Sequence, residues 1–212
     1  MQNPDIHRML YANHVAPRAA VVGWSGARLT ARILGFAIAA ALSAQFRVFL
    51  PATDVPFTLQ TVVVLLAGFM LPPLEAGGAM LLYVACGAVG LPVFATSAGL
   101  SGLTAGYLLA FPVAAWAISL MRGRREAGVV RLLVAGCAGT LIVFGMAALW
   151  RALLVRGFGG SPATIASAVA VGVWPFVATA GVKLVLAASI VLSLRRVSTV
   201  RKRGHRSTSM RR

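Results

Sequence analysis

Acidic residues are nearly absent from this 212-residue sequence, which has 4 Asp and Glu against 20 Lys and Arg. The acids are Asp5, Asp54, Glu75 and Glu126, and none of them lies inside a long apolar run. An enzyme that uses two carboxylates for acid–base catalysis needs both groups at one site. The sequence therefore does not predict that class of enzyme within its apolar segments.

Cysteine and histidine are also scarce. Cys86 and Cys137 lie in separate apolar segments, without the spacing of a metal or redox site. His7, His14 and His205 lie in the polar ends of the chain, which removes the usual general base from the apolar segments. No Gly-rich phosphate loop of the G-x-x-x-x-G-K-[ST] type occurs. We therefore expect no enzymatic activity, no metal and no cofactor.

Apolar residues dominate what remains. They make up 59% of the sequence, charged residues make up 11%, and the mean hydropathy is +0.86. A soluble domain of this length could not bury so much apolar surface. The runs do not alternate as barrel strands do, and they suit an all-α integral membrane protein. Six transmembrane helices are predicted at Ile33–Leu50, Leu59–Leu71, Gly77–Leu91, Ala105–Met121, Val129–Leu153 and Val171–Leu194.

The net charge of +16 indicates orientation, not nucleic-acid binding. Four arginines precede the first run, four lie between Arg122 and Arg131, and eight Lys or Arg lie between Arg195 and Arg212. Basic residues gather in cytoplasmic segments, beside anionic lipid. Both chain ends are therefore predicted in the cytoplasm, with no nucleic-acid partner. The predicted parts are a tail at 1–30, a six-helix domain at 31–196 and a basic tail at 197–212.

Three short segments on the predicted external side carry groups that suit a ligand. In V-P-F-T-L-Q-T (residues 55–61), Thr58 and Gln60 offer hydrogen bonds, although helix capping would explain them as well. In G-L-P-V-F-A (residues 90–95) and in the later G-L-T-A-G-Y, Phe94 and Tyr107 offer ring surfaces. Ordinary loop formation would explain the glycines of these strings equally well.

Lys183 is the one formally charged residue deep inside a predicted span. Lysine at such a depth is costly, and it usually faces a cavity or pairs with an anion. No acid lies in any predicted span to serve as its partner. An anionic ligand would neutralise this charge, whereas a structural alternative is a side chain that snorkels to the membrane surface.

Several strings together resemble one family, the BioY proteins, which are the biotin-binding S components of energy-coupling-factor (ECF) transporters. The match runs in order from about Ile33 to Leu194. It comprises Gln45–Leu50, V-P-F-T-L-Q-T at 55–61, G-L-P-V-F-A at 90–95, A-G-Y-L-L-A-F at 105–111, Pro175-Phe176 and Lys183.

The resemblance implies a multi-pass subunit of the bacterial plasma membrane that binds biotin near its external face. It further implies a transmembrane coupling subunit and ATPase subunits as partners, with Ala37 and Ala41 of the first helix in that contact. Biotin would then place its carboxylate at Lys183, and its rings would pack near Phe94 and Tyr107.

Two departures from the family pattern affect the expected site. The family's G-P-T-G-G-Y reads G-L-T-A-G-Y at 102–107, and its P-G-D-x-x-K reads A-T-A-G-V-K at 178–183. Ala180 thus stands where an aspartate is expected to engage the ligand. This alanine has three possible consequences. Other residues replace the aspartate's contact with the ligand, the affinity for biotin is weak, or the ligand is another small carboxylate-bearing vitamin. A noncatalytic membrane assembly protein that has lost binding is a further alternative.

Overall fold

The structure is a computed structural model that describes residues 18–49, 53, 55–123 and 127–209. Within these ranges the chain is almost entirely α-helical, which confirms the predicted all-α class. The helices are α2 (Arg18–Gln45), α3 (Gln60–Met70), α4 (Pro73–Ala88), α5 (Ala105–Arg122), α6 (Val129–Gly157) and α7 (Pro162–Ser209). A short 3-10 helix, η1 (Gly99–Ser101), follows α4.

A two-stranded hairpin lies between α2 and α3. Strand β1 (Arg47–Val48) pairs antiparallel with β2 (Phe57–Thr58), and Arg47 lies opposite Thr58. The pairing of β2 with β1 holds Thr58 two residues before Gln60, where α3 begins. The hairpin therefore holds the predicted P-F-T-L-Q segment beside the helical bundle.

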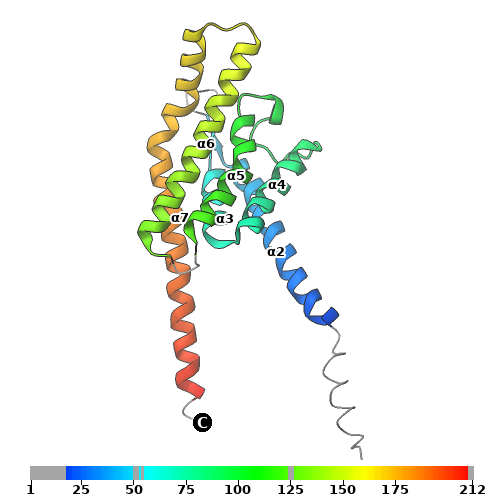
Figure 1. Ribbon diagram of the computed structural model, residues 1–212, viewed down its shortest axis with the longest axis vertical. Helices are drawn as coiled ribbons and strands as arrows, with labels where there is room; N and C mark the ends of the chain where they lie inside the picture. The colour runs from blue at the N-terminus through cyan, green and yellow to red at the C-terminus, as the bar shows by residue number, and fades with distance from the viewer. Residues whose placement is uncertain (1–17, 50–52, 54, 124–126, 210–212) are drawn as a thin grey trace, which may run out of the picture.

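The helices form one bundle (Figure 1). Helix α5 packs against α3, α4 and α6, while α7 packs against α6 and α3. Helix α2 lies against α4 and α3. The start of α2 and the end of α7 lie at one end of the molecule, and the connection between α6 and α7 lies at the opposite end (Figure 1).

Within the part of the chain that the structure describes, four helices are long and apolar enough to cross a membrane by length and composition: α2 from Gly26, α5, α6 and α7 through Val197. Helix α3 has 11 residues and α4 has 16. At about 1.5 Å per residue, both are shorter than the roughly 30 Å hydrocarbon core of a bilayer.

Helix ends differ from those predicted. Helix α2 begins at Arg18, within the segment predicted as a tail, because no proline follows Pro17 until Pro51. It ends at Gln45, short of Leu50, because β1 pairs with β2. The predicted Leu50 and residues 1–17 lie outside the described residues.

The later helices differ in the same way. Helix α4 begins at Pro73, which occupies a first-turn position that suits proline. It ends before Gly90, whose φ of 94° favours glycine. Helix α7 runs from Pro162 to Ser209, well beyond both predicted limits of the sixth span and into the segment predicted as a basic tail.

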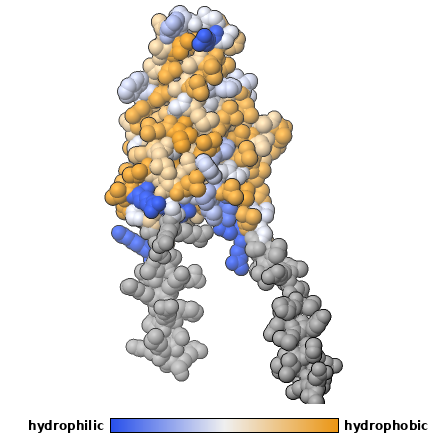
Figure 2. Space-filling model, in the orientation of Figure 1, coloured by the Kyte–Doolittle hydropathy of each residue, from blue (hydrophilic) through white to orange (hydrophobic). Residues whose placement is uncertain are grey.

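Apolar side chains cover most of the face of the bundle that Figure 2 shows, and more hydrophilic residues lie at its two ends. Leu141, Trp174 and Val182 are each at least 70% exposed. Large apolar side chains exposed all around a bundle indicate a lipid environment. The structure thus agrees with a membrane protein that has several apolar helices.

Glycines bring the helices into close contact. A Cβ atom on Gly106 of α5 would lie 2.5 Å from Trp150 Cβ and 2.8 Å from Ala147 Cα, both on α6. A Cβ on Gly68 of α3 would lie 2.6 Å from Ile118 Cβ on α5. Small residues at such positions allow helix backbones to approach closely in membranes.

Gly106→Ala is therefore expected to push α5 away from α6 and to destabilise the protein by about 1 to 3 kcal/mol. The melting temperature of the detergent-purified chain measures this effect. Gly145→Ala, on the same α6, is the matched control because a Cβ there meets no atom within 4 Å. Equal melting temperatures for the two variants would contradict the proposed role of Gly106.

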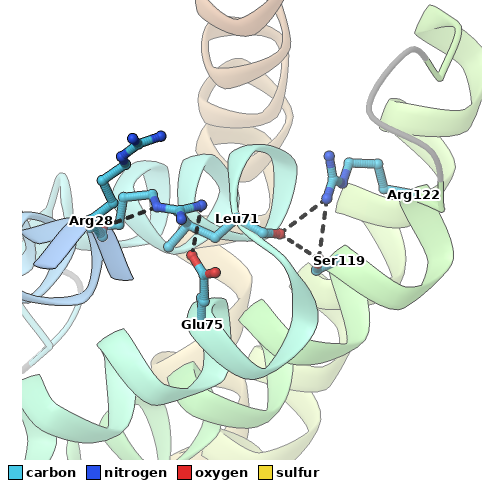
Figure 3. Close-up of polar contacts among 6 residues, drawn as sticks. Arg28, Leu71, Glu75, Ser119 and Arg122 are labelled. Carbon is cyan, nitrogen blue, oxygen red and sulfur yellow. Dashed lines mark hydrogen bonds and ion pairs between the residues drawn. The ribbon is translucent and has the colours of Figure 1, made fainter. Parts of the chain in front are cut away.

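Polar contacts join the helices at the end that carries the start of α2 (Figure 3). Arg32 of α2 pairs with Glu75 of α4 at 3.1 Å. Ser119 Oγ and Arg122 Nη2, both on α5, donate to the carbonyl oxygen of Leu71 at 2.6 and 3.0 Å. Arg122 is buried, so its charge stabilises the carbonyl at the end of α3 away from water.

Candidate binding pocket

A largely apolar cavity lies between the hairpin, the segment after α4 and helices α3, α5, α6 and α7. It encloses about 870 Å³ of space free of protein atoms, its opening included. Sites for small molecules and cofactors share this predominantly apolar lining. Its apolar wall includes Val64 of α3, Leu108 and Phe111 of α5, Val143 of α6 and Phe176 of α7.

The structure brings all five predicted ligand-binding residues to this cavity: Thr58, Gln60, Phe94, Tyr107 and Lys183. They come from segments far apart in the sequence, which the bundle gathers around one space. Their contribution to binding stays a prediction, but their common location does not depend on the resemblance that suggested them.

Thr58 and Gln60 belong to a chain of hydrogen bonds. Thr58 Oγ1 donates to Gln60 Oε1 at 3.0 Å, and Gln60 Nε2 donates to the Tyr83 hydroxyl at 2.6 Å. The Tyr83 hydroxyl then donates to the carbonyl oxygen of Val93 at 3.2 Å. Helix α3 has no side-chain cap, so the capping interpretation of Thr58 is wrong. These hydrogen bonds instead fix the side-chain amide of Gln60, which is buried.

Phe94 is held in place by two neighbours. Its ring meets that of Tyr83 edge-on, with centroids 5.5 Å apart and planes at 84°. It also lies directly over Gly87 of α4, where any Cβ atom would collide with the ring. Gly87 therefore has a packing function, and the segment after α4 can place Phe94 in the cavity wall.

Tyr107 connects α5 to α7. Its hydroxyl donates to the carbonyl oxygen of Gly172, and its ring lies 6.4 Å from that of Phe176. Arg151 of α6, which is 2% exposed, donates from Nε to the carbonyl oxygen of Ala168 at 2.7 Å. This hydrogen bond joins α6 to α7.

Lys183 lies in the cavity wall and is 8% exposed. Its Nζ atom lies 4.0 Å from the centroid of the Phe57 ring, a distance typical of a cation–π contact. The side chain therefore does not snorkel to the surface. Within the described residues, Lys183 has no hydrogen bond or ion pair. Glu75, the acidic residue that those ranges contain, pairs with Arg32 instead.

Ala180 lines the same cavity, one helical turn before Lys183. Residues three apart on a helix share a face. A carboxylate at this position would therefore lie beside Lys183, and alanine leaves that part of the wall apolar. The position at which this sequence has alanine in place of the family's aspartate thus lies in the wall of the candidate pocket.

The two alanines predicted at a partner interface differ in how deeply they are buried. Ala37 is 7% exposed and belongs to the core of the bundle, while Ala41 is partly buried against that core. The exposed side of α2 is formed by Leu34, Ile38 and Leu42. Ala37 therefore faces the other helices of this chain.

The fold and the cavity together define a class of protein. The structure matches the crystal structure of the S-component for biotin from an ECF-type ABC transporter, with a TM-score of 0.67 and 17% sequence identity. The match covers 81% of this chain and 93% of that one. The chain thus has the fold of a transporter S component.

The sequence identifies the family within this class. The pattern of the BioY family matches residues 15–199. The biotin transporter BioY of Thermotoga maritima is 35% identical over 156 residues, which cover 72% of this chain and 88% of that protein. A probable biotin transporter BioY of Pyrococcus horikoshii is 37% identical over 127 residues, or 58% of this chain and 70% of that protein. The chain belongs to the BioY family, as its sequence strings predicted.

Proposed function

We propose that this chain is the membrane-embedded, biotin-binding subunit of an ECF-type transporter. The observation that carries the proposal is a buried apolar cavity containing Lys183, whose ammonium group has no ion pair within the described residues. A small molecule with apolar rings and one carboxylate complements such a site. The names of the relatives, which are biotin transporters, support biotin as that molecule.

In this proposal the ligand carboxylate pairs with Lys183, which the Phe57 ring holds in position. The bicyclic ring system lies against Phe94 and Tyr107, with Thr58 and Gln60 supplying hydrogen bonds. The protein performs no covalent chemistry. It binds biotin from the external side and exposes it inward when partner ATPases supply energy.

We further propose six membrane-spanning segments, with both chain ends in the cytoplasm of a bacterial cell. The start of α2 and the end of α7 lie at the same end of the molecule, which supports this orientation (Figure 1), as do the basic residues near them. The short α3 and α4 would cross a locally thinned edge of the bilayer. A carboxy-terminal reporter that is active only outside the cytoplasm would contradict this topology.

The proposed partners are a transmembrane coupling subunit and ATPase subunits. Of the two alanines predicted at this contact, Ala41 is the better candidate, because Ala37 is buried in the core. The exposed Leu34, Ile38 and Leu42 on the same helix would extend the contact or face lipid.

Uptake in a biotin-requiring bacterium without its own importer tests the proposed function. The chain, expressed with an ECF coupling module, should restore growth at limiting biotin concentrations. The coupling module alone should not. Growth that depends on the module but not on this chain would contradict the proposal.

One observation favours a second candidate ligand. Ala180 leaves the wall beside Lys183 apolar, so another carboxylate-bearing vitamin with a less polar ring could fit. Competition of unlabelled vitamins against labelled biotin distinguishes the two. A vitamin that displaces biotin at lower concentration than biotin itself would identify the second candidate as the substrate.

A further inference from the structure

Thr61 differs from the other hydroxyl-bearing residues that line the cavity. Its Oγ1 atom is buried and has no hydrogen-bond partner among the described residues. The other cavity hydroxyls all have partners there: Thr58 bonds Gln60, Thr96 bonds Thr104, Thr140 bonds the Gly136 carbonyl, and Tyr107 bonds the Gly172 carbonyl.

The position of Thr61 makes this lack of a partner informative. Threonine within a helix commonly bonds a carbonyl of the preceding turn, as Thr140 does on α6 at 2.9 Å. Thr61 lines the cavity as the second residue of α3, so no preceding turn of that helix supplies such a carbonyl. A buried polar atom without a partner costs free energy and requires an explanation. A bound ligand in the cavity supplies one.

We infer that Thr61 is a specificity-determining residue whose hydroxyl bonds the neutral, polar ring of the ligand. This inference rests on the proposed function. Lys183 is the group suited to the carboxylate, and Ala180 contributes no polar atom. A cyclic urea carries both N–H donors and a carbonyl acceptor, and a hydroxyl can donate and accept. Thr61 thus supplies a ring contact from α3 where α7 lacks one.

Thr61→Val tests the assignment because valine keeps the branched shape and removes only the hydroxyl. In the detergent-purified full chain it should raise the dissociation constant of biotin about fivefold. The melting temperature of the ligand-free variant should equal or exceed that of the wild type, since an unpaired polar atom has gone. Thr61→Ser, which keeps the hydroxyl, should bind within about twofold of the wild type.

Thr140→Val is the matched control, because Thr140 lines the same cavity but its hydroxyl is already bonded. It should raise the dissociation constant of biotin less than Thr61→Val does, and an equal loss for the two variants would overturn the Thr61 assignment. Biotin amide, which lacks the carboxylate charge, should show the same fivefold loss with Thr61→Val as biotin does, because the contact is to the ring. With Lys183→Met, by contrast, the amide should show little loss.

The outcomes separate the two proposals. If the wild type binds biotin and Thr61→Val binds it equally well, the Thr61 assignment is overturned and the proposed function stands. A loss on Thr61→Val that appears for biotin but not for the amide also overturns it, because the contact would then be to the carboxylate. A wild-type protein that binds neither ligand overturns both proposals.

Discussion

Lys183→Met is expected to raise the dissociation constant of biotin about 30-fold or more. Lys183 is 8% exposed, and within the described residues its ammonium group has the Phe57 ring and no acid as a neighbour. Removing one partner of a desolvated charge pair commonly costs about 2 to 5 kcal/mol, partly because the other charge is left buried. Equilibrium binding to the detergent-purified chain measures the change.

The amide of biotin separates charge pairing from a structural role of Lys183. The wild type should bind the amide poorly, since the lysine is then left unpaired. Lys183→Met should weaken amide binding little further, because that pairing is already lost. If acid and amide lose affinity equally on Lys183→Met, the lysine acts through the shape of the cavity, and the charge-pairing account fails.

Ala180→Asp is expected to tighten biotin binding about tenfold, which is the usual worth of a hydrogen bond to a charged group. Ala180 lines the cavity one turn before Lys183. An aspartate there would accept a hydrogen bond from a ring N–H of the ligand. Lys183 on the same helix face would keep the new carboxylate charged. Titration calorimetry in detergent measures the affinity.

Ala180→Asn provides the control, because it adds a similar volume without a negative charge. It should give a smaller gain than Ala180→Asp. Unchanged or weaker binding by a folded Ala180→Asp protein would show that the ring does not approach this part of α7. The ligand would then lie differently from the family pattern that suggested the substitution.

Sequence reasoning predicted the helical class and the cavity residues for different reasons. Long apolar runs determine membrane helices almost alone, because the bilayer imposes their length and composition. Thr58, Gln60, Phe94, Tyr107 and Lys183 were found through short strings and one costly charge. The structure then placed all five at one cavity.

The remaining features depend on contacts between distant residues. Helix α2 ends at Gln45 because β1 pairs with β2. The apolar run up to Leu50 gives no sign of this pairing. Ala37 lies in the core of the bundle. Its spacing from Ala41 alone is equally compatible with the exposed side of the helix. The lack of a hydrogen-bond partner for the Thr61 hydroxyl among the described residues likewise depends on side-chain positions that the sequence does not show.

Equilibrium binding of labelled biotin to the purified chain, without partner subunits, tests the central claim most directly. We predict saturable binding at one site with submicromolar affinity, displaced by unlabelled biotin and only weakly by its amide. Absence of saturable binding by the folded protein, or equal displacement by acid and amide, would contradict it.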